Sequence, residues 1–189
     1  MKVVCVLASP RHGSHSAAIA RRFLDTAAAL GAETREFALR KLTYRGCQAC
    51  YACKKKLDHC GLRDDLTPVL EAVRESELLV LATPTFFGDL PGQLKCFIDR
   101  TYSFLTPDHE TSPQTSRLQP GKKLVFVITQ GHPDERVFAD VFPRYAELMK
   151  MPGFAESHLI RVCGVGPDSG AAVQAYLPKA EELARALMA

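Results

Sequence analysis

The stretch from Val3 to Ser16, VVCVLASPRHGSHS, decides the fold. Its first six residues form a short continuous apolar run, which is typical of a strand buried on both faces of a parallel sheet. The polar turn that follows leads into a helical pattern, in which Ile19, Phe23 and Ala27 recur on one face up to Leu30. A buried strand, a polar turn and an amphipathic helix in this order indicate an α/β protein.

The alternation of strand and helix continues along the chain. Residues 78–82 (LLVLA) and 124–129 (LVFVIT) are two more continuous apolar runs, whereas the strands expected at 33–39 and 159–165 are more polar. Three inner strands and two edge strands account for this difference, because only inner strands are buried on both faces. Apolar spacing and start signals predict helices after Asp64-Asp65, at 94–101, at 137–148 and from Pro178 to Ala189. This order predicts a doubly wound sheet of five parallel strands with helices on both faces.

Length and composition limit the class of protein. The chain has 189 residues, of which 47% are hydrophobic, and we expect one domain over residues 1–189. A net charge of +3 with 24% charged residues is too balanced to indicate nucleic-acid binding. No apolar run approaches the ~20 residues of a membrane span, and the opening residues lack the pattern of a signal peptide. These features predict a cytoplasmic protein with neither nucleic acid nor membrane as a partner.

Residues 46–63, which we call the cysteine loop, carry Cys47, Cys50, Cys53 and Cys60 in the spacing C-x2-C-x2-C-x6-C. Thiolates are soft ligands, and a compact loop that turns four of them inward matches the needs of an iron–sulfur cluster or a zinc ion. A disulfide framework would need an oxidising compartment, for which the opening residues give no signal. A redox-active thiol pair and idle cysteines are the other interpretations.

Ligands of doubly wound sheets bind at the carboxyl ends of the strands, where the strand order reverses. After the first strand, residues 9–16, the phosphate loop, offer hydroxyls, backbone N–H groups, an arginine and a helix N-terminus, as a phosphate group requires. After the third strand, residues 83–88 offer two adjacent phenylalanines that can pack on a flat heteroaromatic ring. Residues 129–132 would close this site from a third side.

Three segments carry a resemblance to the flavodoxin-like family of NAD(P)H-dependent FMN reductases, and within it to the iron–sulfur flavoproteins. The first, ASPR at 8–11 followed by His15-Ser16, resembles the G-S-P-R…N-T phosphate loop of the family, from which Ala8 and His15 depart. The cysteine loop followed by Asp64-Asp65 resembles its compact cysteine motif and the helix start after it. The third, PTFFG at 84–88 with QLK at 93–95, Phe97 and Asp99-Arg100, resembles its P-x-Y-F/M-G…Q-L-K…F-D-R segment.

The resemblance implies a flavodoxin-like sheet of order 2-1-3-4-5, non-covalently bound FMN, NAD(P)H as electron donor and a homodimer or homotetramer. It also implies a 4Fe–4S cluster held by the four cysteines of the cysteine loop. The residues expected to hold FMN are Ser9, Arg11, His15 and Ser16 at the phosphate, and Pro84, Thr85, Phe86, Phe87, Gly88, Thr129, Gln130 and Gly131 around the ring. No catalytic acid or base is expected, because a flavin carries the chemistry itself.

Three functions are compatible with these features. The first is an FMN-dependent oxidoreductase that passes electrons from NAD(P)H through the flavin to a small-molecule or flavin acceptor. The second is an electron-transfer protein whose cluster exchanges electrons with ferredoxin, with Lys54, Lys55 and Lys56 facing an acidic partner. The third is a flavodoxin-fold module with a zinc-stabilised loop and no turnover. Residues 103–121 are long for a structureless connection, which predicts a lid or a subunit contact.

Overall fold

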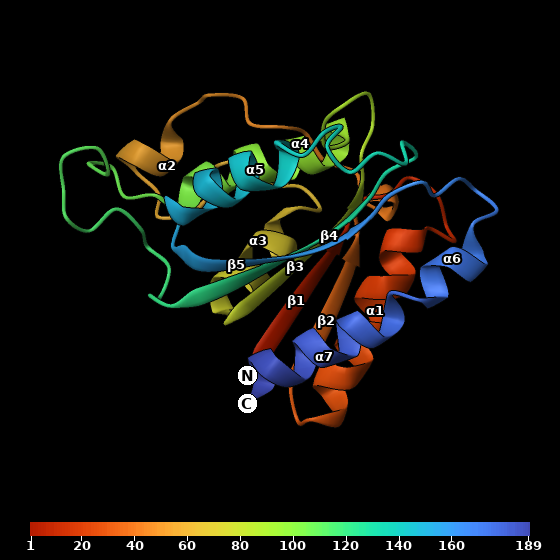
Figure 1. Cartoon of the computed structure of the whole chain (residues 1–189). Coiled ribbons are helices and arrows are strands. Elements are labelled where there is room, and N and C mark those ends of the chain that lie inside the picture. Colours follow the sequence, from red (N-terminus) through yellow and green to blue (C-terminus); the bar gives the residue numbers. More distant parts are fainter.

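The computed structural model describes residues 1–189. One five-stranded sheet forms its centre, and all strands are parallel in the order β2-β1-β3-β4-β5 (Figure 1). The strands are β1 (Lys2–Leu7), β2 (Glu33–Ala38), β3 (Leu78–Pro84), β4 (Lys122–Thr129) and β5 (Phe154–Val162). The predicted fold and strand order are confirmed. The two more polar strands lie at the edges of the sheet, where one side of the strand faces solvent.

Helices cover both faces of the sheet (Figure 1). One face carries α1 (His15–Ala29) and α7 (Leu177–Met188), with the short α6 (Gly170–Gln174) in contact with α1. The other face carries α3 (Thr67–Glu75), α4 (Gly92–Arg100) and α5 (Val141–Lys150). Successive strand residues point to opposite faces. In β1, Val3 and Cys5 therefore join the core under α1 and α7, while Val4 and Val6 join the core under the other three helices.

The register of the sheet brings the predicted site loops together. Leu7 of β1 pairs with Ala82 of β3, and the backbone N–H of Ala8 donates to Ala82 O at 2.8 Å. The backbone N–H of Thr85, just beyond β3, donates to Thr129 O at the end of β4 at 2.7 Å. The loops that follow the three inner strands therefore lie together at the carboxyl ends of the strands, which is where ligands bind in this architecture.

The structure corrects several boundaries. The fifth strand begins at Phe154 rather than at 159, because residues 156–158 pair with β4 although they are polar. An edge strand is partly exposed, so its sequence need not be apolar. Val137, predicted as helical, lies in the loop before α5. Leu30 and Leu148, which belong to the apolar patterns that predicted their helices, are 51% and 42% exposed.

Two segments contain little regular structure. The cysteine loop holds only the single turn α2 (Ala52–Lys55), and it follows the short 3-10 turn η1 (Leu39–Lys41). Residues 103–121 begin in the 3-10 turn η2 (Thr101–Phe104) and contain one antiparallel bridge, between Leu105 and Ser116. None of the helices has the length and apolar composition that a membrane crossing requires.

Candidate functional site

The phosphate loop joins β1 to α1, and its own serines shape it. Ser14 caps α1, since its Oγ accepts the backbone N–H of Ala17 at 3.3 Å. Ser9 Oγ accepts the backbone N–H of Arg11 at 3.3 Å. Both serines are buried. The first turn of α1 contains no acidic residue, so no carboxylate neutralises the positive end of the helix dipole at this loop.

Two buried hydroxyls at this edge of the sheet have no hydrogen-bond partner. Ser16 Oγ lies in the first turn of α1, and Thr85 Oγ1 comes directly after β3. Buried polar groups are nearly always paired, and an unsatisfied one costs about 1–3 kcal/mol. Both hydroxyls therefore fit a ligand. Ser16 was expected at the phosphate of FMN and Thr85 at its ring, and both contacts stay predictions.

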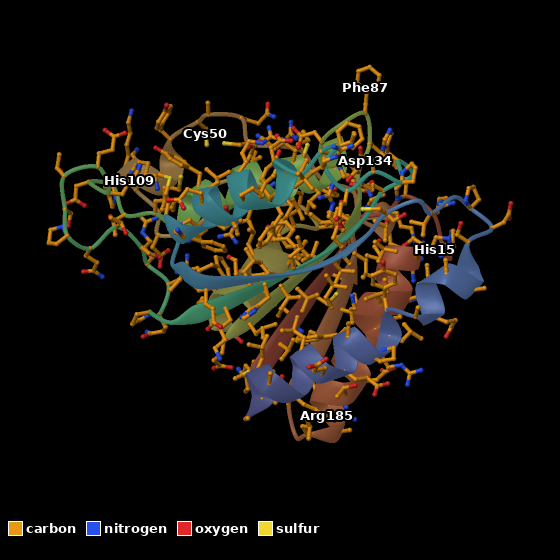
Figure 2. All side chains as sticks on the ribbon, in the orientation of Figure 1. His15, Cys50, Phe87, His109, Asp134 and Arg185 are labelled. Carbon is orange, nitrogen blue, oxygen red and sulfur yellow. The ribbon has the colours of Figure 1, made fainter.

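The Nε2 atom of His15 is hydrogen-bonded within the protein. Its side chain is buried, and Nε2 bonds to Gly166 O at 2.8 Å, in the loop between β5 and α6. Figure 2 shows His15 at the start of α1, close to α6. A carbonyl oxygen only accepts hydrogen bonds, so Nε2 carries the proton. The ring thus ties the phosphate loop to the β5–α6 loop, and the predicted contact of His15 with a phosphate stays a prediction.

The loop between β3 and α4 presents an aromatic side chain to solvent. Phe87 has a φ of 48° and is followed by Gly88 at 84°. A left-handed backbone costs a residue with a side chain roughly 1–2 kcal/mol. Phe86 is 46% exposed and Phe87 is fully exposed, and Figure 2 shows the Phe87 ring projecting away from the protein. A strained loop with unburied aromatic rings is typical of a surface that contacts a ligand or a partner.

Hydrogen bonds from the side-chain amide of Gln130 hold the loop after β4 in place. Gln130 is buried, and its Nε2 donates to His132 O at 2.9 Å and to Asp134 O at 3.2 Å. Its Oε1 accepts from Arg161 Nε at 3.1 Å, and Arg161 also donates to Glu135 O at 2.7 Å. The Gln130 side chain therefore holds its own loop, and only backbone groups of this predicted site residue are left for a ring. Sequence reasoning missed Arg161, because this contact joins the loop after β4 to β5, 31 residues further along the chain.

The four cysteines of the cysteine loop line one cavity of about 150 Å³, together with Arg100 and Tyr102. Cys47 and Cys50 are exposed, whereas Cys53 is buried and Cys60 is partly buried. No three of these thiols converge closely enough to share a metal ion. Four thiols on one mostly apolar cavity are nevertheless the donor set that an iron–sulfur cluster or zinc requires. Their ligation of either group stays a prediction.

The backbone turns sharply on both sides of Cys50. Ala49 and Tyr51 flank it at φ values of 49° and 54°, a region that residues with a side chain rarely adopt. On the opposite side, a Cβ added to Gly61 would lie 3.7 Å from Cys50 Sγ. The tighter neighbour of that Cβ would be Ala52 Cβ at 3.0 Å, so Gly61 lets the end of the loop pack against α2.

Two basic side chains connect the cysteine loop to residues 103–121. Lys54 Nζ donates to Tyr102 O at 2.8 Å and to Leu105 O at 2.6 Å, and it lies 4.2 Å from the centre of the Tyr102 ring. Arg117 donates to Cys53 O at 2.8 Å. Sequence reasoning placed Lys54 in a partner-facing triplet and missed Arg117. No local pattern reveals either contact, because each joins distant parts of the chain.

Burial shifts the pKa of two neighbouring groups here. It raises the pKa of the Cys53 thiol, an effect that the positive charge of Lys54 opposes. It lowers the pKa of Lys54, an effect that Cys53 opposes. Metals and clusters bind the thiolate form, so a ligand at Cys53 would displace a proton on binding.

Solved structures share this fold. An FMN-dependent NADH-azoreductase from Bacillus anthracis in complex with FMN superimposes with a TM-score of 0.76 at 14% identity, over 100% of both chains. An NAD(P)H:quinone oxidoreductase from Methanothermobacter marburgensis gives 0.75 at 18% identity, over 100% of this chain and 98% of that one. At such low identity these matches show the flavodoxin-like fold alone.

Sequence relatives identify the family more closely than the fold does. The iron-sulfur flavoprotein of Methanosarcina thermophila is 32% identical over 101 residues, which are 53% of this chain and 52% of that protein. An iron-sulfur flavoprotein of Methanocaldococcus jannaschii is 31% identical, with the same coverage of each chain. The chain spans about half the length of the curated relatives it matches. The family model of NADPH-dependent FMN reductases matches residues 1–151, and the chain therefore belongs to this family.

Proposed function

We propose that this protein is an FMN-dependent oxidoreductase that passes electrons from NAD(P)H through the flavin to an acceptor. The observation that carries the proposal is the hydroxyl of Ser16 in the first turn of α1, which is buried and has no hydrogen-bond partner. A phosphate oxygen at that helix N-terminus would satisfy the hydroxyl and would also meet the positive end of the helix dipole. Family membership supports the choice of FMN as the phosphate-bearing ligand.

In the proposed site, different residues contact the phosphate and the ring of FMN. Ser9, Arg11 and Ser16 hold the phosphate, and His15 keeps the adjoining β5–α6 loop in place through Gly166. Pro84 to Gly88 and the backbone of residues 129–131 line the ring, where Thr85 Oγ1 offers a free hydroxyl. FMN supplies hydride acceptance and onward transfer of one or two electrons. The protein orients the ring and shields it from water, so no side chain is assigned as an acid or a base.

We also propose that Cys47, Cys50, Cys53 and Cys60 hold a 4Fe–4S cluster. Their shared cavity supports this, as do the relatives named iron-sulfur flavoproteins. A cluster favours the second candidate function, in which the protein is an electron carrier with ferredoxin as partner. Lys55 and Lys56 are exposed within the cysteine loop and suit an acidic partner. Lys54 does not, because two carbonyl oxygens already engage its ammonium group.

We propose further that residues 1–189 form a single cytoplasmic domain that assembles into a homodimer or homotetramer. The fully exposed Phe87 supports an interface near the ring site, because isolated proteins seldom leave a strained aromatic ring in water. Residues 103–121, which the cysteine loop contacts through Lys54, would contribute to acceptor choice.

The two functions differ in what reduces the flavin. The experiment mixes the protein, purified without oxygen, with NADPH, NADH or reduced ferredoxin, and follows the visible absorbance of the flavin over time. Fast bleaching by a nicotinamide supports the oxidoreductase. Bleaching by ferredoxin alone supports the carrier and contradicts the oxidoreductase.

A further inference from the structure

A buried arginine forms part of the wall of the cysteine cavity. Arg100 is the last residue of α4 and is 1% exposed. It lines the same cavity as the four cysteines. Arginine is almost never fully buried without partners that satisfy its charge and its five N–H groups. Its contacts therefore show what this position is built to hold.

One end of the guanidinium is fully engaged by protein. Its Nη1 donates to Asp64 Oδ2 at 2.9 Å, Asp64 Oδ1 at 3.1 Å and Arg45 O at 3.0 Å, and its Nη2 donates to Leu62 O at 3.2 Å. These bonds fix the plane of the group against both ends of the cysteine loop. Asp64 itself is not among the residues that line the cavity, so the carboxylate lies behind the arginine.

The third nitrogen has no partner. Arg100 Nε is buried and makes no hydrogen bond, although leaving a donor on a charged group unsatisfied is costly. Arg100 and Cys60 line the same cavity. Arginine keeps its charge in proteins, so the wall of the cysteine cavity holds a charged group with one unused donor.

We infer that Arg100 is a positioning residue that donates a hydrogen bond to sulfur at the Cys60 side of the cavity and makes the cluster held there easier to reduce. The inference rests on the cluster proposed above. Reduction adds negative charge, and a fixed positive charge in a low-dielectric wall stabilises the more negative form. Hydrogen bonds to the sulfur atoms act in the same direction. Asp64, on the far side, offsets part of this effect.

A purely structural role for the Arg100–Asp64 pair gives a different expectation. In that case the pair only ties Arg45 and Leu62 to α4. Any variant that breaks the pair would then shift the midpoint potential of the cluster in the same direction. The proposed role requires opposite signs. Removing the carboxylate alone leaves a stronger positive charge at the cavity, whereas removing both partners leaves none.

The test measures the midpoint potential of the cluster in the anaerobically purified holoprotein, by a redox titration followed by electron paramagnetic resonance. Asp64→Asn should raise the potential. The double variant Arg100→Gln with Asp64→Asn leaves no unpaired buried charge, which protects the fold, and it should lower the potential. We expect the double variant to change the reduced-to-oxidised ratio at least tenfold, about 59 mV for a one-electron couple.

Arg63→Gln is the matched control. It removes a positive charge three residues from Cys60, but Arg63 is exposed, so solvent and salt screen its effect and the potential should not move. Shifts of the two Asp64 variants in the same direction, or no shift in either, would overturn the inference. A wild-type protein without iron would contradict the proposed cluster and this inference together, whereas iron with unshifted variants would contradict the inference alone.

Discussion

The phosphate loop and the cysteine loop are both irregular segments at functional positions, yet they are built in different ways. In the phosphate loop, the serines are buried, and the hydroxyls of Ser9 and Ser14 fix its shape. In the cysteine loop, two of four thiols are exposed, and side chains from distant segments such as Arg100 and Arg117 hold the backbone. The turn of the phosphate loop is thus shaped by bonds between near neighbours, with His15 as its one long-range tie to Gly166, whereas the backbone of the cysteine loop depends on side chains from distant segments.

The largest expected effect separates the two sites. Replacing Cys53 and Cys60 together by serine should abolish iron and sulfide binding, because two of four soft ligands are lost. FMN content should not change, since no residue of the phosphate loop contacts the cysteine cavity. Iron, sulfide and flavin analyses of the purified variant check both halves of this prediction. Loss of flavin together with the iron would show that the two sites are not independent.

The second prediction concerns the phosphate loop alone. Ser16→Ala should weaken FMN binding by about 10- to 100-fold, because a hydrogen bond to a charged group is worth about 1.5–3 kcal/mol. Flavin fluorescence titration of the flavin-free protein measures the change. Thr26→Ala is the control, since Thr26 lies on the same helix with an exposed hydroxyl bonded to Arg22 O. Riboflavin, which lacks the phosphate, should bind both proteins equally, and an equal loss for riboflavin would refute the assigned contact.

The third prediction tests whether the strain at Phe87 serves binding. Phe87→Gly should stabilise the flavin-free protein by about 0.5–1 kcal/mol, because glycine adopts a positive φ without the steric cost of a side chain. Its FMN affinity should fall, because the ring that would cover the flavin is gone. Thermal unfolding and flavin titration measure the two effects. Phe87→Ala removes the ring but keeps a Cβ, so it should weaken binding without stabilising the protein. A stabilised variant with unchanged affinity would argue against a role for Phe87 at the flavin.

The smallest expected effect is a difference in acid sensitivity. Burial acts to raise the pKa of Asp64, but its hydrogen bonds to Arg100 and to backbone N–H groups hold the pKa below the ordinary aspartate value. Its stabilising contribution is therefore present above pH ~4 and is lost as the pH falls through the lowered pKa of the folded state. Melting temperatures between pH 7 and pH 3 should fall more steeply for the wild type than for Asp64→Asn. Parallel curves would mean that Asp64 does not contribute to acid sensitivity.

Local patterns predicted the fold well. The apolar runs at 78–82 and 124–129 lie inside β3 and β4, and the turn after β1 leads into α1 as expected. Errors arose where a strand is half exposed, as at residues 156–158 of β5. The spacing of apolar residues carries no signal there, because pairing with β4 rather than burial defines the strand.

The candidate site was predictable in its position but not in its contacts. Strand order alone places the loops at 9–16, 83–88 and 129–132 at one edge of the sheet. The bonds of His15 to Gly166 and of Gln130 to Arg161 could not be predicted, because each joins residues far apart in the sequence. The same holds for Arg100, whose partner Asp64 was noted only as a helix start.

The decisive experiment determines the content of flavin, iron, sulfide and zinc in protein purified without oxygen and records its visible spectrum. A chain with an FMN site at the carboxyl ends of the strands and a separate cluster site in the cysteine loop should contain FMN, iron and sulfide in stoichiometric amounts, with no zinc. Zinc, or no metal at all, in the cysteine loop would contradict the cluster, and failure to bind flavin even after addition of FMN would contradict the account as a whole.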